Sequence, residues 1–333
     1  KNKKNFYQET INASYYNKNI IRIVDSLDFI LLDSGTLIFY LLSKMAKKKG
    51  VKVVMNGTGA DEIFGGYYWQ NQILKIPNFL RSSIFKIKIT ILMKISLILQ
   101  NKLKYVSNVL SFFASPLEWQ VRTWTNGFGN FFKYEDKKII FNKIYLINKN
   151  FYLLVKKTKT DFMNLFNYLT IKIFTLEQLH KIDLASMNSS IESRAPFLDH
   201  DVVEVMMSIR HNIKNKEGRE HKGLMKFFSE GIISKKILNR KKSGPTLNLK
   251  FFFPKKNYAL YLNFIKKNKH IIVSYLGILF YKKFIENFSN KDFFSKNLPH
   301  LFAVINFVLW YKIKIENSIQ NKKNITLMKV LES

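Results

Sequence analysis

The chain has 333 residues, of which 47% are hydrophobic and 23% charged, and its formal net charge is +32. This composition supports a folded core in one large domain or two moderate ones, and it excludes global disorder. The sequence contains no cysteine, which excludes disulfides, cysteine nucleophiles and thiolate metal sites and fits a cytoplasmic protein.

The positive charge invites a nucleic-acid or membrane-surface function. Only seven of the 55 basic residues are arginine, and the lysines are spread along the whole chain. A nucleic-acid site more often concentrates its basic residues, and especially its arginines, in one segment. We therefore expect no specific nucleic-acid partner, although nonspecific binding to polyanions is expected in vitro.

The first predicted elements belong to a strand–helix–strand unit. Apolar residues at helical spacing predict a helix from Ser34 to Lys49, with Ser34 as its N-cap and Gly50 at its end. A short buried strand follows at Val51–Met55. We place the preceding strand of the unit at Ile20–Val24.

That strand runs into a glycine-punctuated turn that delivers an acidic pair, Asn56-Gly57-Thr58-Gly59-Ala60-Asp61-Glu62. In open α/β sheets, ligands bind outside the carboxyl ends of the strands, and helix N-termini there favour anions. Two carboxylates would repel a phosphate unless a divalent cation lay between them, and Mg²⁺ is typically held by carboxylates together with substrate phosphates. The turn therefore predicts a nucleotide or pyrophosphate–Mg²⁺ site. A simple chain reversal is the alternative.

From Pro77 to Lys104 the pattern is mostly helical, with lysine-studded amphipathic stretches. They predict the buried faces of a helical layer, with membrane-surface helices as the alternative. The longest apolar stretches are too short or too interrupted to span a bilayer, namely Ile84–Leu99, Ile271–Tyr281 and Leu301–Trp310. We expect no membrane span.

A helix predicted around Ile173–Ser190 leads into a block rich in polar residues. If the helix continues, Glu192 and Arg194 face different directions, because residues two apart do not share a helix face. Pro196 ends the helix and lets Arg194 and Asp199 flank a loop. The residues alone allow a helix end with satisfied salt bridges or a binding site, and Arg194 is the best-suited group to bind a carboxylate through two hydrogen bonds.

A third block is basic and comprises Gly218–Lys222 and Ile237–Gly244. Such a charge run is usually a solvated face. Three of the seven arginines fall in the second and third blocks, Arg194, Arg219 and Arg240, which hints that planar donors are needed there. The six histidines show no metal-ligand spacing.

The end of the chain is predicted to be helical up to about Lys314, with a polar tail at residues 321–333. No internal repeat or long linker interrupts the chain. We therefore assign residues 1–320 to one domain, or most of one.

The three blocks together resemble the asparagine synthetase family of the glutamine-hydrolysing type. Residues 51–67 are similar to its Ser-Gly-Glu-Gly-Ala-Asp-Glu-Leu-Phe-Gly-Gly-Tyr turn, and residues 183–200 to its Asp-x-x-Ser-Met-x-x-Ser-x-Glu-x-Arg-x-Pro-Phe-Leu-Asp-His segment. Residues 240–244 resemble its Arg-x-Lys-x-Gly/Gln turn. The resemblance implies the fold of the C-terminal synthetase domain, an ATP-pyrophosphatase-like α/β fold with a parallel sheet and a largely helical C-terminal part.

The resemblance also implies a reaction and its site. The reaction is ATP-dependent amidation of a carboxylate through an acyl-adenylate, most directly aspartate to asparagine with glutamine-derived ammonia, and the cofactors are ATP and Mg²⁺. Asp61 and Glu62 are the implied metal ligands. The implied nucleotide contacts are Asn56, Gly57, Gly59, Asp61 and Lys242. The implied catalytic residues are Thr58, Glu192, Arg194 and Lys242, of which Lys242 meets the triphosphate.

Two parts of the family's pattern have no counterpart in the sequence. These are the Ser-Gly-Gly-x-Asp-Ser loop that wraps the pyrophosphate, and the N-terminal glutaminase domain with its cysteine nucleophile. Because the chain begins at Lys1 and not at methionine, we expect it to be truncated at its N-terminus, with the first strand and the phosphate loop missing. We expect the fragment alone to be inactive.

A third departure lies inside the acidic turn, where Thr58 stands in place of the family's common acidic residue. Threonine cannot act as a general base near neutral pH. This leaves open a family amidotransferase that acts on a sugar-acid or peptide carboxylate in surface polysaccharide biosynthesis. A non-catalytic, polyanion-binding remnant is the alternative from another class, and the sequence leaves a homodimer open.

Overall fold

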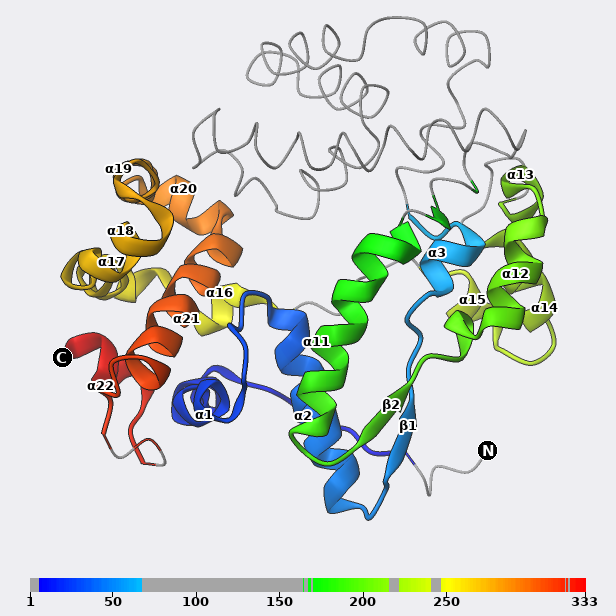
Figure 1. Ribbon diagram of the computed structural model, residues 1–333, viewed down its shortest axis with the longest axis horizontal. Coiled ribbons are helices and arrows are strands. Elements are labelled where there is room, and N and C mark those ends of the chain that lie inside the picture. The colour runs from blue at the N-terminus through cyan, green and yellow to red at the C-terminus, as the bar shows by residue number, and fades with distance from the viewer. Residues whose placement is uncertain are drawn as a thin grey trace, which may run out of the picture. The chain divides into compact units, whose positions relative to one another are not determined.

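The computed structural model describes residues 6–67, 164, 167, 168, 170–215, 222–240, 247–320, 322 and 324–333. Lys242 and the predicted helices at residues 77–104 lie outside the described residues. The described part is helical apart from a two-stranded parallel sheet of β1 (Val53–Met55) and β2 (Glu192–Arg194) (Figure 1). The chain divides into two compact units, one of residues 1–50, 184–191 and 244–333, and one of residues 51–183 and 192–243.

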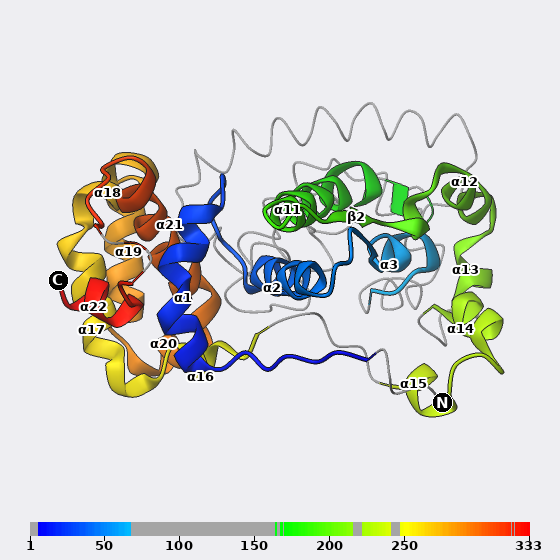
Figure 2. The same cartoon turned by 90° about the horizontal axis from the view of Figure 1, so that it is seen from below.

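The first unit is an assembly of helices around α21 (Leu298–Lys314), which is buried along most of its length. A helix that is apolar on all sides is expected at the centre of a core. Helices α1, α16 and α17 pack directly against α21 (Figures 1 and 2). The helices of this unit other than α21 are α1 (Ala13–Ser26), α2 (Ser34–Lys48), α16 (Leu249–Phe252), η5 (Lys255–Asn257), α17 (Tyr258–Lys267), α18 (Lys269–Leu276), α19 (Ile278–Phe288), α20 (Lys291–Lys296) and α22 (Leu327–Glu332).

The strand predicted at Ile20–Val24 is wrong, because these residues lie within α1. Their β-branched side chains favour a strand locally. However, Asn12 caps the helix by accepting a hydrogen bond from the Tyr15 N–H, and Tyr16, Ile20 and Val24 are buried at a spacing of four residues. Burial of that helical face overrides the local preference.

The helix predicted at Ser34–Lys49 is confirmed as α2, but its N-cap is Asp33 and not Ser34. The Asp33 carboxylate accepts hydrogen bonds from the Thr36 N–H and the Thr36 hydroxyl, both at 3.0 Å. Gly50 follows the helix end with φ +71°, a conformation that glycine adopts without a steric penalty.

The predicted strand at Val51–Met55 is confirmed as β1, although β1 is shorter and is not buried in the described part of the chain. Val53 is 42% exposed and Met55 is 80% exposed. The helix predicted around Ile173–Ser190 is also confirmed, as the π-helical turn η3 (Ile171–Thr175) followed by α11 (Leu176–Met187).

The second unit carries β1 and β2 and has a small core of Ile63, Phe64 and Met206. Phe197 packs against this core, with its ring 5.9 Å from that of Phe64 in an edge-to-face arrangement. The remaining elements of this unit are α3 (Ala60–Phe64), η4 (Pro196–Leu198), α12 (His200–Ser208), α13 (His211–Lys214), α14 (Gly223–Ser229) and α15 (Lys235–Leu238).

The C-terminal region is helical up to Lys314, as predicted. Within the expected polar tail, residues 327–332 form α22, which packs against α1 and α17. Leu327, Val330 and Leu331 are the buried residues of this helix. Among the described helices, none is long and apolar enough to cross a membrane.

The central position of α21 gives a stability prediction. Ile305 is fully buried in this helix, and Ile305→Val should lower the free energy of unfolding by about 0.5–1.5 kcal/mol. Ile315, directly after the helix, is 53% exposed, so Ile315→Val should change it by less than about 0.5 kcal/mol. Urea denaturation of both variants measures the difference, and equal values would show that α21 is not at the centre of a core.

Candidate functional site

The pairing of β1 with β2 brings the first and second sequence blocks together. The strands are parallel, and Val54 pairs with Ser193 and Met55 with Arg194. One residue further, the Asn56 N–H donates to the Arg194 carbonyl oxygen at 2.8 Å. The carboxyl ends of both strands therefore meet at one edge, which is where ligands bind in parallel α/β sheets.

The turn after β1 is held by the side chain of Asn56. Its Oδ1 accepts from the Thr58 N–H at 2.9 Å, and its Nδ2 donates to Ser193 Oγ at 3.0 Å. Gly59 then precedes α3 with φ +95°, and a Cβ atom there would lie 2.5 Å from the Leu198 side chain. Glycine at this position thus lets the η4 turn close over the Asn56–Asp61 turn.

Asp61 forms an ion pair with Lys222, with 2.9 Å between Oδ1 and Nζ. The two side chains are only 29% and 27% exposed. A Cβ atom on Gly66 would lie 1.8 Å from Asp61 Oδ1 and 2.4 Å from Lys222 Cε. Gly66 is therefore required for the carboxylate and the ammonium group to meet.

The backbone of Lys222 is in the left-handed region, with φ 54° and ψ 37°. This conformation costs a non-glycine residue about 1–2 kcal/mol. The Lys222 N–H donates to the Gly65 carbonyl oxygen at 3.4 Å, and its carbonyl oxygen accepts from the Lys226 N–H at 2.9 Å. The fold thus holds this lysine against Asp61 despite local strain, which is a common feature of functional sites.

Glu62 points to a different partner from that of Asp61. Glu62 is 5% exposed, and its carboxylate accepts a hydrogen bond of 2.5 Å from the Tyr67 hydroxyl. Burial raises the pKa of Tyr67 far above its ordinary value, and the negative charges of Glu62 and Asp61 raise it further. Tyr67 therefore stays protonated and donates to Glu62 at all physiological pH values.

Loss of this donor gives a second stability prediction. In Tyr67→Phe the buried Glu62 carboxylate loses a hydrogen bond, so the free energy of unfolding should fall by about 1–3 kcal/mol. Tyr7 is half-exposed, and its ring lies under Lys49 Nζ, a contact that Phe retains. Tyr7→Phe is thus a matched control with little expected effect. Denaturant titration measures both, and an unchanged Tyr67→Phe midpoint would contradict the prediction.

Glu192 and Arg194 lie in β2, so the expectation that they face different directions on a helix is wrong. The helix ends at Met187, and Ser190, with φ 56°, turns the chain into the strand. Residues two apart share a face of a strand. Accordingly Arg194 Nε donates to Glu192 Oε1 at 2.7 Å, and this hydrogen bond and its charge lower the pKa of Glu192 and raise that of Arg194.

Two buried polar side chains of the α13 region pack against the backbone that follows α3. His211 and Asn215 are fully buried, and His211 Nε2 lies 2.9 Å from Asn215 Nδ2. Gly65, with φ +72°, allows their approach, because a Cβ atom there would lie 2.6–2.7 Å from both side chains. Gly65, directly after α3, thus lies against the His211 and Asn215 side chains at α13.

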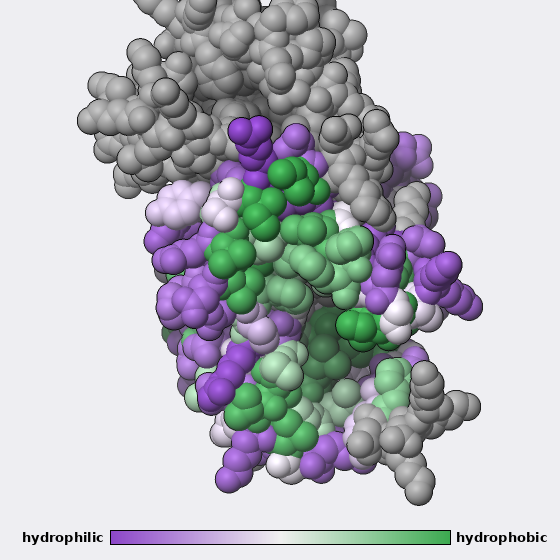
Figure 3. Space-filling model, turned by 90° about the vertical axis from the view of Figure 1, so that its right-hand side faces the viewer, coloured by the Kyte–Doolittle hydropathy of each residue, from purple (hydrophilic) through white to green (hydrophobic). Residues whose placement is uncertain are grey.

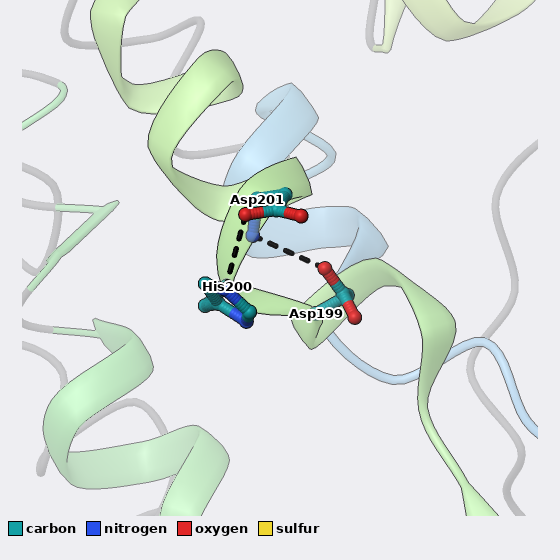
Figure 4. Close-up of side chains that lie close together, drawn as sticks. All are labelled: Asp199, His200 and Asp201. Carbon is teal, nitrogen blue, oxygen red and sulfur yellow. Dashed lines mark hydrogen bonds and ion pairs between the residues drawn. The ribbon is translucent and has the colours of Figure 1, made fainter.

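A second group of side chains of the types that can hold a metal ion lies at the start of α12, where the ligand atoms of Asp199, His200 and Asp201 are within 4.8 Å of one another (Figure 4). All three are exposed. Asp199 caps α12 by accepting from the Asp201 N–H at 3.1 Å, and His200 Nε2 lies 3.0 Å from Asp201 Oδ1. These contacts explain the grouping as a helix start.

Comparison with known proteins agrees with the family resemblance of the sequence blocks. The profile described as asparagine synthase matches residues 7–291. The chain belongs to the asparagine synthase family. It is 27% identical over 319 residues to asparagine synthetase [glutamine-hydrolyzing] 1 of Bacillus subtilis, which covers 92% of this chain and 48% of the relative. No solved structure matches the chain.

Shorter matches of this asparagine synthase family member include asparagine synthetase [glutamine-hydrolyzing] 3 of Bacillus subtilis, 41% identical over 76 residues, covering 23% of this chain and 12% of the relative. Another is the putative asparagine synthetase [glutamine-hydrolyzing] 1 of Methanocaldococcus jannaschii, 39% identical over 56 residues, covering 17% and 10%. The match thus spans about half the length of Bacillus subtilis asparagine synthetase 1, and a smaller share of the other two relatives.

In this family member, the predicted site residues between Asn56 and Glu62 follow β1, and Glu192 and Arg194 lie in the neighbouring strand β2. Asn56 and Arg194 are joined by a backbone hydrogen bond where β1 and β2 end, and Asp61 lies in α3 after the turn that follows β1. Lys242 lies outside the described residues. Sequence reasoning did not single out Lys222 or Tyr67. Lys222 stood inside a basic run that is typical of a solvated face, and its place beside Asp61 depends on a left-handed backbone that sequence pattern does not reveal.

Proposed function

We propose that this chain carries the site at which MgATP activates a carboxylate as an acyl-adenylate for amidation. The observation that carries the proposal is the Asp61–Lys222 ion pair, whose carboxylate lies in α3 after the turn that follows β1. An anionic and a cationic group in one partly buried position suit a magnesium–phosphate ligand, because the carboxylate can hold Mg²⁺ while the ammonium contacts phosphate.

The residues present fit Mg²⁺ at one carboxylate. Asp61 is partly exposed and forms an ion pair with Lys222, whereas Glu62 is buried and hydrogen-bonded to Tyr67. We therefore assign the metal contact to Asp61, with Glu62 holding Tyr67 and the turn in place. Mg²⁺ bound there would stabilise the charge on the departing pyrophosphate.

The protein groups have separate roles in the proposed reaction. The acceptor carboxylate oxygen bonds to the α-phosphorus and the bond to pyrophosphate breaks; ammonia then bonds to the acyl carbon and AMP leaves. Lys222 and, by family resemblance, Lys242 stabilise negative charge on the phosphates. The backbone N–H groups of Gly57 and Gly59, in the turn that carries Asn56 and Asp61, contact the nucleotide. Arg194, which forms an ion pair with Glu192, orients the acceptor carboxylate.

Aspartate is the proposed acceptor, and glutamine-derived ammonia the proposed nitrogen source. The likeness to glutamine-hydrolysing asparagine synthetases supports both. The half of the Bacillus subtilis relative that this chain does not span leaves room for a glutaminase domain, which we propose as the functional partner.

The test is an acceptor-dependent assay with the full-length product of the reading frame. The protein is incubated with MgATP, ammonium and either aspartate or a sugar acid, and AMP, pyrophosphate and amide are quantified. We expect the three products in equal amounts, and only with aspartate. If only the sugar acid gave an amide, the proposed acceptor would be wrong and the proposed adenylation would stand. If no acceptor released AMP, the proposed function would be rejected.

A further inference from the structure

An exposed apolar surface lies at the end of α14 and the start of α15. Five large apolar side chains from one short stretch of the chain make it up, and we refer to them as the α14–α15 surface. They are Phe227 (60% exposed), Phe228 (63%), Ile232 (83%), Ile233 (37%) and Ile237 (64%). Single exposed apolar residues are ordinary, but a contiguous group marks an interaction site. Figure 3 shows this side of the molecule, where apolar residues gather with hydrophilic ones at their border.

The turn between α14 and α15 has a hydrogen-bonded backbone and exposed isoleucine side chains. Ile232 and Ile233 both donate their N–H groups to the Ser229 carbonyl oxygen, at 3.2 and 3.0 Å. Gly231, with φ +80°, provides the turn between them and α14. A side chain that is 83% exposed, as Ile232 is, has almost no protein around it. The turn thus presents its isoleucines outward in a defined conformation.

Charge around the surface restricts the partner. Residues 222–240 contain five basic residues and one acidic residue, Glu230. Lys235, Lys236 and Arg240 are exposed beside the apolar side chains. A second copy of the chain would place like charges against each other, which is unfavourable. The phosphates of a nucleic acid would neutralise the lysine charges, but a nucleic acid would offer no apolar environment for the isoleucines.

We propose that the α14–α15 surface docks onto the anionic phospholipid surface of a membrane. Exposed phenylalanine and isoleucine side chains enter the boundary between headgroups and acyl chains, while the neighbouring basic side chains contact lipid phosphates, as in other interfacial anchors. A protruding apolar turn suits a deformable lipid surface, whereas a protein partner would need a pocket to receive it. The proposal does not depend on the adenylation activity.

The first test is sedimentation with vesicles. The full chain should pellet with vesicles that contain phosphatidylglycerol and not with phosphatidylcholine alone. The variant Phe227→Ser/Phe228→Ser/Ile232→Ser should lose about tenfold or more in vesicle binding, because three apolar side chains no longer leave water. Its matched control is Phe6→Ser/Phe251→Ser/Ile315→Ser, which removes two phenylalanines and one isoleucine that are 75%, 68% and 53% exposed elsewhere.

Both triple variants keep the net charge, so binding through charge alone predicts equal sedimentation of both. Equal sedimentation of the two triple variants would overturn the proposal, and so would a wild-type chain that does not pellet with anionic vesicles. If polyuridylate displaces the vesicles and the first triple variant binds as the wild type does, the partner is nucleic acid. Sedimentation velocity without vesicles identifies self-association, which the first triple variant would abolish if a second copy were the occupant.

A second test does not depend on the folding of a triple variant. The chain has no cysteine, so Ile237→Cys and Phe251→Cys each provide a single labelling site. A polarity-sensitive dye at position 237 should shift its emission to the blue on addition of phosphatidylglycerol vesicles, and a dye at position 251 should not. Equal emission at position 237 with and without vesicles would reject insertion of this surface.

Discussion

Asp61→Asn in the full-length product of the reading frame should lower the rate of pyrophosphate release from MgATP by about 10²–10³-fold, the loss typical of removing one group that stabilises charge in the transition state. Asparagine has nearly the same shape as aspartate, so the turn and its contact with Gly66 should persist. What changes is the charge that would hold Mg²⁺ beside Lys222. The loss should therefore appear mainly in kcat, and excess Mg²⁺ should restore part of it.

The matched control is Asp199→Asn, in the exposed group at the start of α12 (Figure 4). Asparagine caps a helix as well as aspartate does, so α12 should be preserved. We expect pyrophosphate release within about twofold of the unchanged protein, since the loss per substitution at an uninvolved surface site is small. If Asp199→Asn lost as much activity as Asp61→Asn, or Asp61→Asn kept full activity, the assignment of the metal contact to Asp61 would be wrong.

The free energy of unfolding of Asp61→Asn distinguishes a loss of catalysis from a loss of folded protein. The Asp61–Lys222 pair is partly exposed, and such ion pairs contribute about 0–1 kcal/mol. Asp61→Asn should therefore unfold at nearly the denaturant concentration of the unchanged protein. A large loss of stability together with activity would show a structural role for the carboxylate.

The acidic turn could be predicted from the sequence because its determinants are local. An apolar run, glycines at 57 and 59, and an Asp-Glu pair specify a strand, a tight turn and a short helix without reference to distant residues. The parallel partner of the strand could not be derived in the same way. Residues 192–194 form a strand only because Ser190 breaks the preceding helix and because the register with Val53–Met55 provides hydrogen bonds.

The fold of the N-terminal residues shows the opposite limit. The run Ile20–Val24 has the composition of a strand, and its helical state follows from packing against α21 and α16, which lie almost the whole chain away. The aromatic contacts of Tyr16 with Phe252 and Phe302 belong to the same packing, with ring distances of 5.1 and 6.2 Å. Tertiary burial of this kind overrides local propensity and leaves no local signal.

The ion pair of Asp61 and Lys222 illustrates why only one of two neighbouring charged residues could be singled out from the sequence. The carboxylate stands in a motif, whereas the lysine is one of many in a lysine-rich chain. Its distinguishing property is the left-handed backbone, which asparagine or glycine would adopt more readily. A lysine in such a strained backbone position is a reason to propose a function for it, because strained residues cluster at functional sites.

Lys222→Gly should therefore reduce the rate of pyrophosphate release by about 10–100-fold and leave the free energy of unfolding within about 1 kcal/mol of the unchanged value. Glycine relieves the left-handed strain, and this gain offsets the loss of the ion pair with Asp61. The rate falls because the variant lacks the ammonium that we propose contacts the phosphates. Initial rates at several MgATP concentrations, together with urea denaturation, measure both effects.

Two further variants define what Lys222 supplies. Lys222→Arg keeps the positive charge and should recover much of the lost rate, with a higher KM for MgATP because the guanidinium is larger and planar. Lys235→Gly removes an exposed lysine of the same unit and should keep the rate within about twofold. Equal losses in Lys222→Gly and Lys235→Gly would assign the effect to overall charge, and full activity of Lys222→Gly would remove the lysine from the phosphate site while leaving Asp61 to be judged by its own variant.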